Sequence, residues 1–346
     1  MRRLLVVVLV AMLALAAGAA FYGAHILSRI QEPYKGFVES EKFVDIPTGA
    51  STAEIRRRLV DAGVVSDEFV FRAALVWTGR SRALQAGEYR FDRPMGAVDV
   101  IEKIARGDVY AHPITFPEGL TIREMAAIYQ SRGFGTAREF VDAARNAMLI
   151  TDLDPAADDL EGYLFPETYA LSRGTPATTL TRIMVDRFRE TYANLQSTRS
   201  GEQGLSLRQV VTLASLVEKE TAKAEERPLV AAVYHNRLKR RMAMQADPTV
   251  VYALVKAGTY DGNIRKRDLS FDSPYNTYKY PGLPPGPIAS PGRASLTAAL
   301  APADVSYLYF VSRNDGSHVF ADTLRQHNAN VYEHQVLYFR KQRLGK

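Results

Sequence analysis

The feature that most constrains this chain is an uninterrupted apolar run of 21 residues near its start, Leu4 to Ala24. A helix rises about 1.5 Å per residue, so a helix of this length is about as long as the hydrocarbon layer of a bilayer is thick. Arg2 and Arg3 precede the run, and basic residues favour the cytoplasmic side. The sequence therefore predicts a single-pass anchor over residues 1–30 in the inner (cytoplasmic) membrane, with a short cytoplasmic N-terminus and the body in the periplasm.

A cleaved signal peptide is the alternative interpretation of this segment, because Ala17, Gly18 and Ala19 resemble a processing site. The apolar core of a signal peptide is usually only about 7 to 15 residues long, which is shorter than the run found here. We therefore expect a retained anchor. Under either alternative, the body of the protein is exported from the cytoplasm.

The composition removes several kinds of site. Cysteine is absent, which excludes disulfides, thiolate metal sites and a cysteine nucleophile. The net charge of +6 comes from short, scattered basic clusters, so we predict no nucleic-acid partner. No HExxH pair, Gly-x-Ser-x-Gly elbow or P-loop occurs, and His327 and His334 are too far apart in sequence to hold one metal by themselves. We expect neither a metal nor a cofactor.

An approximate internal repeat follows a polar tether at residues 31–43. Two segments, beginning at Val44 and at Ile114, align with a constant offset of 70 residues. Each copy reads as a short strand, a Pro-x-Gly turn, a helix and a glycine stop. The serine or threonine expected to open each helix is Ser51 in the first copy and Thr121 in the second.

The first copy belongs to a predicted subdomain over residues 44–112, with the order strand, helix, helix, strand and a further helix. This order resembles the small LysM-type glycan-binding module. A purely structural stalk is the alternative, and the residues do not choose between the two. Residues 113–346 then form the remaining domain, so the whole body is predicted to be an α+β protein.

A helix beginning with Ser206 carries two unexpected carboxylates. Ser206 and Gln209 form a capping-box pattern, and apolar residues then recur at helical spacing. Glu218 and Glu220 both lie among apolar directions of this helix. A buried carboxyl group can have a raised pKa and act as a general acid, but it can equally form a structural ion pair, here with Lys219, Arg227 or Arg237. Helical spacing alone does not decide between these roles.

Two further stretches are dense in aromatic residues and proline. In the segment LEGYLFPETY, Tyr163, Phe165 and Tyr169 could stack on sugars, but we expect most of it to be a loop held in a core by its aromatic rings. The stretch at 270–292 is rich in proline, glycine and tyrosine, and we expect it to be ordered and functional. A hairpin around Asp315 and Gly316 and a terminal helix complete the chain.

Four motifs in this half resemble those of the YceG-like family of endolytic murein transglycosylases. They are EKET (218–221), QADPTVVYAL (245–254), YNTY (275–278) and GLPPGPIASPG (282–292). The resemblance implies a lysozyme-like or lytic transglycosylase catalytic domain at 113–346, with Glu218 as the catalytic acid. It also implies cleavage, without water, of the β-1,4 bond between N-acetylmuramic acid and N-acetylglucosamine in nascent peptidoglycan. The 1,6-anhydro ends so formed would terminate strand elongation.

The resemblance implies peptidoglycan glycan strands, the inner membrane and peptidoglycan synthases as partners. For the other motif residues we predict supporting roles. Gln245 and Asn276 would offer amide groups to the substrate or to Glu218, and Tyr275 and Tyr278 would stack on sugars or orient the acid. Asp247 is expected to cap a helix and Glu220 to support packing.

Two alternatives stay open at this point. A lysozyme-like hydrolase would need a second carboxylate, for which the sequence offers Asp247, Asp268 or Asp272. A non-enzymatic scaffold that binds the cell wall would use only the LysM-like region.

Overall fold

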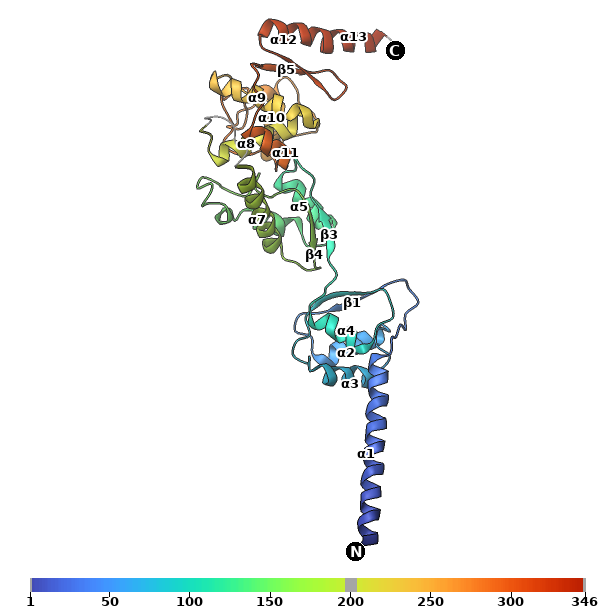
Figure 1. The fold of residues 1–346 in the computed structure, drawn as a ribbon. Coiled ribbons are helices and arrows are strands. Elements are labelled where there is room, and N and C mark those ends of the chain that lie inside the picture. Colours follow the sequence, from blue (N-terminus) through green and yellow to red (C-terminus); the bar gives the residue numbers. More distant parts are fainter. Residues whose placement is uncertain (1, 197–203, 345–346) are drawn as a thin grey trace. The chain divides into compact units, whose positions relative to one another are not determined.

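A computed structural model describes residues 2–196 and 204–344 (Figure 1). The chain divides into two compact units, each with its own core. Unit 1 comprises Met1–Pro113 and Ala170–Arg173, and unit 2 comprises Ile114–Tyr169 and Gly174–Lys346. Helices and short two-stranded sheets occur in both units, so the predicted α+β class is confirmed.

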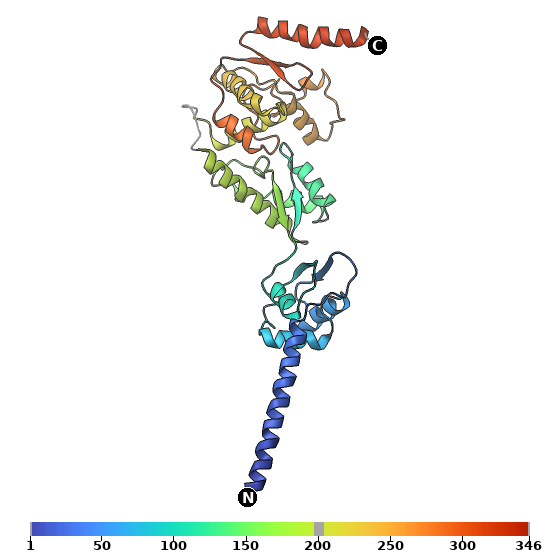
Figure 2. The same cartoon turned by 45° about the vertical axis from the view of Figure 1, so that its right-hand side comes forward.

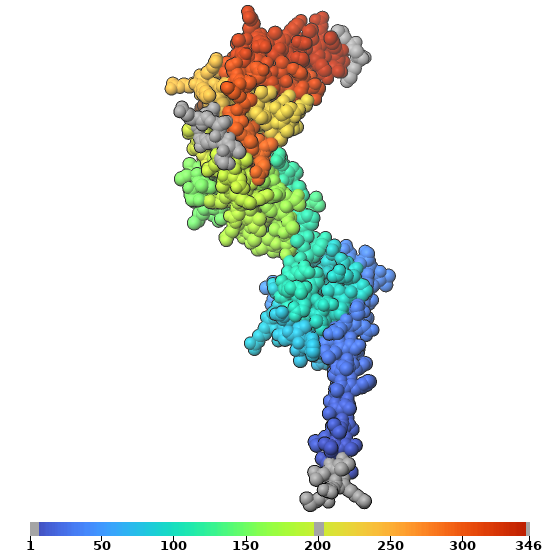
Figure 3. Space-filling model, viewed as in Figure 1, coloured from blue at the N-terminus to red at the C-terminus, as the bar shows by residue number. Residues whose placement is uncertain are grey.

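Unit 1 begins with the long helix α1 (Arg2–Gln31), of which Val7–Gln31 is a candidate membrane span of 25 residues. A window of 18 residues within it has a mean hydropathy of 2.2, which together with the length of the helix is sufficient for a membrane span. Most of α1 stands clear of the rest of unit 1 (Figure 3). An exposed apolar helix is what a membrane anchor requires, and a signal sequence shares this character.

The rest of unit 1 follows the predicted order of strand, helix, helix, strand and helix. The elements are β1 (Lys42–Ile46), α2 (Thr52–Asp61), α3 (Glu68–Thr78), β2 (Gly87–Phe91) and α4 (Ala97–Ala105). Strands β1 and β2 pair antiparallel, with Val44 opposite Tyr89. The side chains of these two residues are buried with those of the three helices in one core. The likeness to a LysM module stays a prediction.

Both copies of the predicted repeat fold as strand, turn and helix. In unit 1, Ser51 caps α2; in the second copy, Thr121 caps α5 (Ile122–Ser131). The turn glycines have nearly the same left-handed backbone, with φ of 80° at Gly49 and 77° at Gly119. Side chains with a Cβ disfavour this conformation, so the glycine in each turn has a backbone reason.

Strands β3 (His112–Thr115) and β4 (Thr168–Leu171) form a two-stranded sheet at the boundary of the two units. The other elements of unit 2 are mainly helical: α6 (Ala137–Ala144), η1 (Ala147–Leu149), α7 (Ala177–Gln196), α8 (Leu207–Glu220), η2 (Ala224–Glu226), α9 (Arg227–Lys239), α10 (Asp247–Ala257), η3 (Asp268–Ser270) and α11 (Arg293–Leu300). The predicted hairpin is β5 (Tyr309–Ser312) with β6 (His318–Ala321), and the chain ends in α12 (Leu324–Val331), the π-helical η4 (Tyr332–Leu337) and α13 (Tyr338–Leu344).

Helix α8 lies at the centre of unit 2, packed against α9, α10 and α11 (Figures 1 and 2). Its capping box of Ser206 and Gln209 is formed as predicted, and every residue from 210 to 217 is buried. The stretch at 270–292 has an ordered path, because residues 286–292 are buried and the Ile288 N–H donates to the Ser215 hydroxyl of α8. The aromatic rings of Tyr163, Phe165 and Tyr169 are in the core, as expected.

The predicted capping role of Asp247 is wrong. Ala246 occupies the N-cap of α10, and Asp247 is the first helical residue, whose side chain makes no capping hydrogen bond. Its carboxylate instead accepts a hydrogen bond of 2.6 Å from the Tyr278 hydroxyl. This contact joins α10 to the YNTY motif, a pairing of residues 31 positions apart that a capping pattern does not reveal.

Candidate active site

Glu218 lies near the end of α8, where the N-termini of two other helices meet it. One carboxylate oxygen accepts a hydrogen bond of 3.0 Å from the backbone N–H of Gly292, the N-cap of α11. The other accepts one of 3.1 Å from the Arg227 guanidinium, at the first residue of α9. The Glu218 side chain is only 6% exposed. The site therefore holds one carboxylate between a helix N-terminus and a cation, both of which favour negative charge.

Glu118 brings a second carboxylate to the same place. Its Oε2 lies 3.6 Å from the Arg227 nitrogen that contacts Glu218, so one guanidinium faces both carboxylates. The Glu118 carboxylate also lies against the Cα of Gly292, where any side chain would overlap it. Burial and the charge of Glu218 raise the pKa of Glu118, and Arg227 opposes this shift. With its side chain 44% exposed, Glu118 is the member of the pair that solvent reaches more easily.

The turn that carries Glu118 is attached to both sides of the site. Gly119 donates its N–H to the Ser290 carbonyl at 2.8 Å, and its own carbonyl accepts from the Lys219 ammonium at 3.1 Å. Sequence reasoning missed Glu118, although it is the middle residue of the second Pro-x-Gly turn. The equivalent residue of the first copy is Thr48. The sequence signal that could have identified Glu118 is therefore the replacement of an uncharged residue by a carboxylate at the same position of the repeated turn.

Glu220 takes part in a different cluster from Glu218. Its carboxylate accepts a hydrogen bond of 2.9 Å from the Tyr234 hydroxyl. Burial raises the pKa of Glu220 to about 7; the Tyr234 hydrogen bond opposes this shift, as does the charge of Arg237, and the charge of Asp247 adds to it. These neighbours hold α8 against α9 and α10. The predicted supporting role of Glu220 has a clear geometric basis in this packing.

Three of the predicted substrate-binding residues are connected with one another through the YNTY motif, and Tyr278 links them to the Glu220 cluster. Tyr278 joins it through Asp247, and Gln245 donates its backbone N–H to the Thr277 carbonyl from a left-handed conformation with φ of 51°. The buried Asn276 amide donates to the carbonyls of Leu269 and Phe271 and accepts from the Tyr278 N–H. Within the described part of the chain, no hydrogen bond joins these residues to Glu218. Their contacts with substrate stay predictions.

Tyr275 lies in a third location. Its ring packs on that of Tyr252 with centroids 4.8 Å apart, and the Lys256 ammonium lies 5.1 Å from its ring centre. Tyr252 and Lys256 also line a cavity of about 230 Å³ that contains Glu161. The Glu161 carboxyl accepts hydrogen bonds from the Ile122 N–H and the Tyr252 hydroxyl. Burial raises the pKa of Glu161 to about 8, and the charge of Asp159 adds to the shift.

The Glu161 carboxyl predicts a pH dependence of stability. Between its ordinary pKa of 4.5 and about 8, the folded protein keeps the proton that the unfolded chain has lost. The folded state then binds more protons, so its free energy of unfolding falls as pH rises, by at most about 1.4 kcal/mol per pH unit. We expect Glu161→Gln to remove this contribution.

Denaturant unfolding of wild type and Glu161→Gln at several pH values between 4 and 9 measures the effect. The difference between the two proteins isolates Glu161, because Glu118 and Glu220 are present in both. The variant is expected to gain stability relative to wild type as pH increases. A difference that does not change with pH would contradict a protonated Glu161 in the folded protein.

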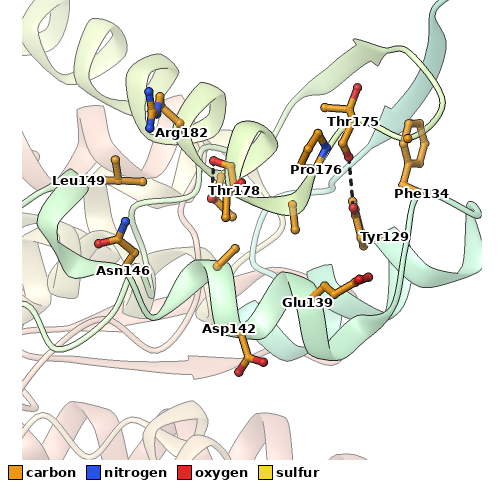
Figure 4. Close-up of a pocket in the computed structure, with 14 residues that line it drawn as sticks. Tyr129, Phe134, Glu139, Asp142, Asn146, Leu149, Thr175, Pro176, Thr178 and Arg182 are labelled. Atoms are coloured by element: carbon orange, nitrogen blue, oxygen red, sulfur yellow. Dashed lines mark hydrogen bonds between the residues drawn. The ribbon is translucent and has the colours of Figure 1, made fainter. Parts of the chain in front are cut away.

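The largest of the described cavities, about 630 Å³, lies elsewhere in unit 2, between α5, α6 and the start of α7 (Figure 4). Its lining includes none of the residues predicted from the sequence motifs. The Tyr129 hydroxyl donates to the Thr175 carbonyl, and Glu139 is held by the Thr136 cap. Among the described ion pairs, Glu139 and Asp142 of this cavity do not share a cation, whereas Glu218 and Glu118 share Arg227.

The three aspartates considered as partner acids for a hydrolase are engaged in other contacts. Asp247 accepts from Tyr278, Asp268 accepts from the Arg265 N–H, and Asp272 pairs with the Lys279 ammonium at 2.8 Å. Among the described residues, the carboxylate that shares a cation with Glu218 is that of Glu118.

Comparisons with known proteins point to one family. The model of the YceG-like family matches residues 44–333. An endolytic murein transglycosylase of Bacillus subtilis is 34% identical over 328 residues, which cover 90% of this chain and 88% of that protein. The enzyme of the same name from Streptococcus pneumoniae serotype 2 is 30% identical over 354 residues, covering 93% of this chain and 63% of that protein.

A solved structure is also similar. The crystal structure of a yceG-like protein from Listeria monocytogenes aligns with a TM-score of 0.57 and 30% sequence identity. The alignment covers 84% of this chain and 98% of that one. Both units described above therefore have counterparts in a related protein.

Proposed function

The chain belongs to the YceG-like family, and from this premise we propose that it is an endolytic murein transglycosylase, a lyase that acts on peptidoglycan, with Glu218 as its catalytic acid. One observation carries the assignment of the residue. The Glu218 carboxylate is nearly buried, yet it lies between the N-terminus of α11 and the Arg227 guanidinium. These groups stabilise the charge that an acid acquires when it gives up its proton.

The proposed reaction needs only the substrate and one acid that becomes a base. The proton of Glu218 moves to the glycosidic oxygen, and the bond between this oxygen and C1 of N-acetylmuramic acid breaks. The C6 hydroxyl of the same sugar then bonds to C1, and its proton returns to Glu218. The products are a free N-acetylglucosamine 4-hydroxyl and a 1,6-anhydro end, with no water consumed.

For the alternative hydrolase, Glu118 is a better candidate for the second carboxylate than Asp247, Asp268 or Asp272, because it lies beside Glu218. Hydrolases use two carboxylates, and the two here face one guanidinium nitrogen, at 3.1 and 3.6 Å. We favour the transglycosylase because the curated relatives of this chain carry that activity in their names and because that reaction needs only one carboxylate. In it, Glu118 positions Arg227 and Glu218 and does not act as a base.

Product analysis separates these two functions. We expect glycan digested by the full-length protein to yield 1,6-anhydro ends, lighter than ordinary reducing ends by one water in mass spectrometry. Glu118→Gln should keep this product and lower the rate by about tenfold, an effect of about 1.4 kcal/mol, because Arg227 loses the charge of one of its two carboxylate neighbours. Reducing ends from wild type, and their loss in Glu118→Gln, would establish the hydrolase instead.

The position at the membrane is part of the same proposal. Arg2 and Arg3 before the apolar helix support a single-pass anchor in the inner membrane, with the catalytic body in the periplasm, where it would end the growth of nascent strands.

The intact mass of the membrane-bound protein tests whether residues 1–19 are retained. Binding of the inactive Glu218→Gln variant to purified sacculi, with and without changes in unit 1, tests the LysM-like role. Cross-linking in cells tests contact with synthases.

A further inference from the structure

Helix α3 of unit 1 is apolar on two faces, although only one of them is in the core. Val70, Phe71, Ala74 and Leu75 are buried. On other sides of the helix, Phe69 is 42% exposed, Val76 83% and Trp77 58%. A helix at the surface of a soluble protein normally presents polar residues outward. The exposed side of α3 therefore needs an apolar neighbour.

The exposed side of α3 lies beside the end of α1. Together they line an apolar groove of about 600 Å³, to which α1 contributes Ile26, Leu27 and Ile30 and α3 contributes Phe69, Val76 and Trp77. Figure 1 shows α3 at the edge of unit 1 from which α1 departs. The groove is thus continuous with the surface of the predicted membrane-spanning helix.

Packing holds α1 and α3 in this arrangement. Ile30 is 1% exposed and belongs to the core of unit 1. The Arg29 guanidinium lies 2.7 Å from the carboxylate of Asp67, the N-cap of α3. A side chain at Gly96 would approach the Gln31 carbonyl to 2.7 Å, so the end of α1 is also in close contact with the start of α4. The end of α1 therefore sets where α3 lies relative to the bilayer.

The length of the apolar run places α3 at the membrane surface. Residues 4–24 span about 30 Å as a helix, which is the thickness of the hydrocarbon layer. Ile26, Leu27 and Ile30 then lie at the level of the lipid headgroups on the far side. Since α3 packs against these residues, its exposed side lies at the same level, where tryptophan is favoured.

We propose that α3 lies in the interface of the outer leaflet of the anchoring membrane and that the occupant of the groove is phospholipid. Phe69, Val76 and Trp77 contact the acyl boundary, and the exposed Arg72 on the same groove reaches the phosphates. The inference rests on the proposed retention of the anchor and not on the catalytic assignment. It means that unit 1 lies on the membrane and is not a stalk that stands clear of it.

Trp77 is the single tryptophan of the chain, so it reports on this contact without labelling. The full-length protein is placed in nanodiscs made with ordinary or brominated phospholipid and with a scaffold protein whose tryptophans are replaced, and tryptophan fluorescence is recorded. We expect brominated lipid to quench most of the Trp77 emission, more strongly with bromine near the headgroup than near the chain end, and aqueous iodide to quench weakly. Emission that brominated lipid leaves unchanged would overturn the proposal, whether the face meets water or another protein.

Two matched variants test whether the apolar face is the cause. Val76→Glu places a charge on the groove, whereas Val38→Glu makes the same change at a fully exposed valine outside the groove. We expect Val76→Glu to reduce quenching by brominated lipid several-fold and Val38→Glu to leave it unchanged. Equal quenching in wild type and Val76→Glu would refute a role for this face.

The same nanodiscs can be assayed for glycan cleavage. Both valine variants are expected to cleave the substrate, because Val38 and Val76 belong to unit 1 whereas Glu218 belongs to unit 2. Failure of the lipid contact with normal cleavage would overturn only the membrane-surface proposal. Normal quenching without any cleavage by wild type would overturn only the proposed function.

Discussion

Glu218→Gln is expected to lower the rate of glycan cleavage by about 10² to 10⁴-fold, the usual contribution of a general acid. The glutamine amide keeps the size of the side chain, and its oxygen can accept from either Arg227 or the Gly292 N–H, although its NH2 then faces the other donor. The amide has no acidic proton to give to a glycosidic oxygen. Since one hydrogen bond is kept and the shape is unchanged, the variant should fold and bind glycan. Mass analysis of released products measures the rate, and thermal unfolding checks the fold.

Glu220→Gln is the matched control for this prediction. It makes the same isosteric change two residues away on the same helix, in the cluster with Tyr234, and the amide oxygen can keep the Tyr234 hydrogen bond. We expect cleavage to stay within a few-fold of wild type. If Glu220→Gln abolished cleavage and Glu218→Gln did not, the assignment of the acid would have to be exchanged between the two residues.

Gly162→Ala is expected to reduce the free energy of unfolding of unit 2 by roughly 2 to 4 kcal/mol, from overpacking and left-handed strain together. Gly162 has φ of 83°. An added Cβ would lie 2.6 Å from the Pro287 Cγ and 3.1 Å from a methyl group of Val211. The proline cannot move away easily, because it belongs to the buried stretch that ends at Gly292 and meets Glu218. Loss of activity should accompany the loss of stability.

Gly174→Ala separates steric overlap from backbone strain. Gly174 also has a left-handed backbone, with φ of 77°, but an added Cβ meets nothing within 4 Å. We expect it to cost only the strain, about 1 kcal/mol. Denaturant unfolding followed by far-UV circular dichroism compares the two variants, since Trp77 reports on unit 1 and not on unit 2. Equal losses would show that Pro287 moves aside and that this contact does not hold the loop.

Local patterns in the sequence predicted much of the fold, because they depend on neighbours in the chain. The apolar run defines α1, the capping box of Ser206 and Gln209 starts α8, and the turn glycines of the repeat occupy left-handed positions. The error at Asp247 has the same origin. An aspartate before proline is a good capping pattern, but its hydroxyl partner, Tyr278, is supplied by a distant loop.

The sequence by itself determined that two glutamates lie on an apolar helix of an α+β protein with an apolar N-terminal helix, and its motifs favoured Glu218 over Glu220. Tertiary structure decided what each one meets. Glu118, 100 residues before Glu218, shares Arg227 with it. Glu220 instead meets Tyr234, and Tyr278, one of the predicted sugar-binding residues, is linked to the Glu220 cluster through Asp247. Helical periodicity gives the direction of a side chain from its own axis. Which cation, carboxylate or N–H lies in that direction depends on how helices distant in sequence pack, and that is a property of the folded chain.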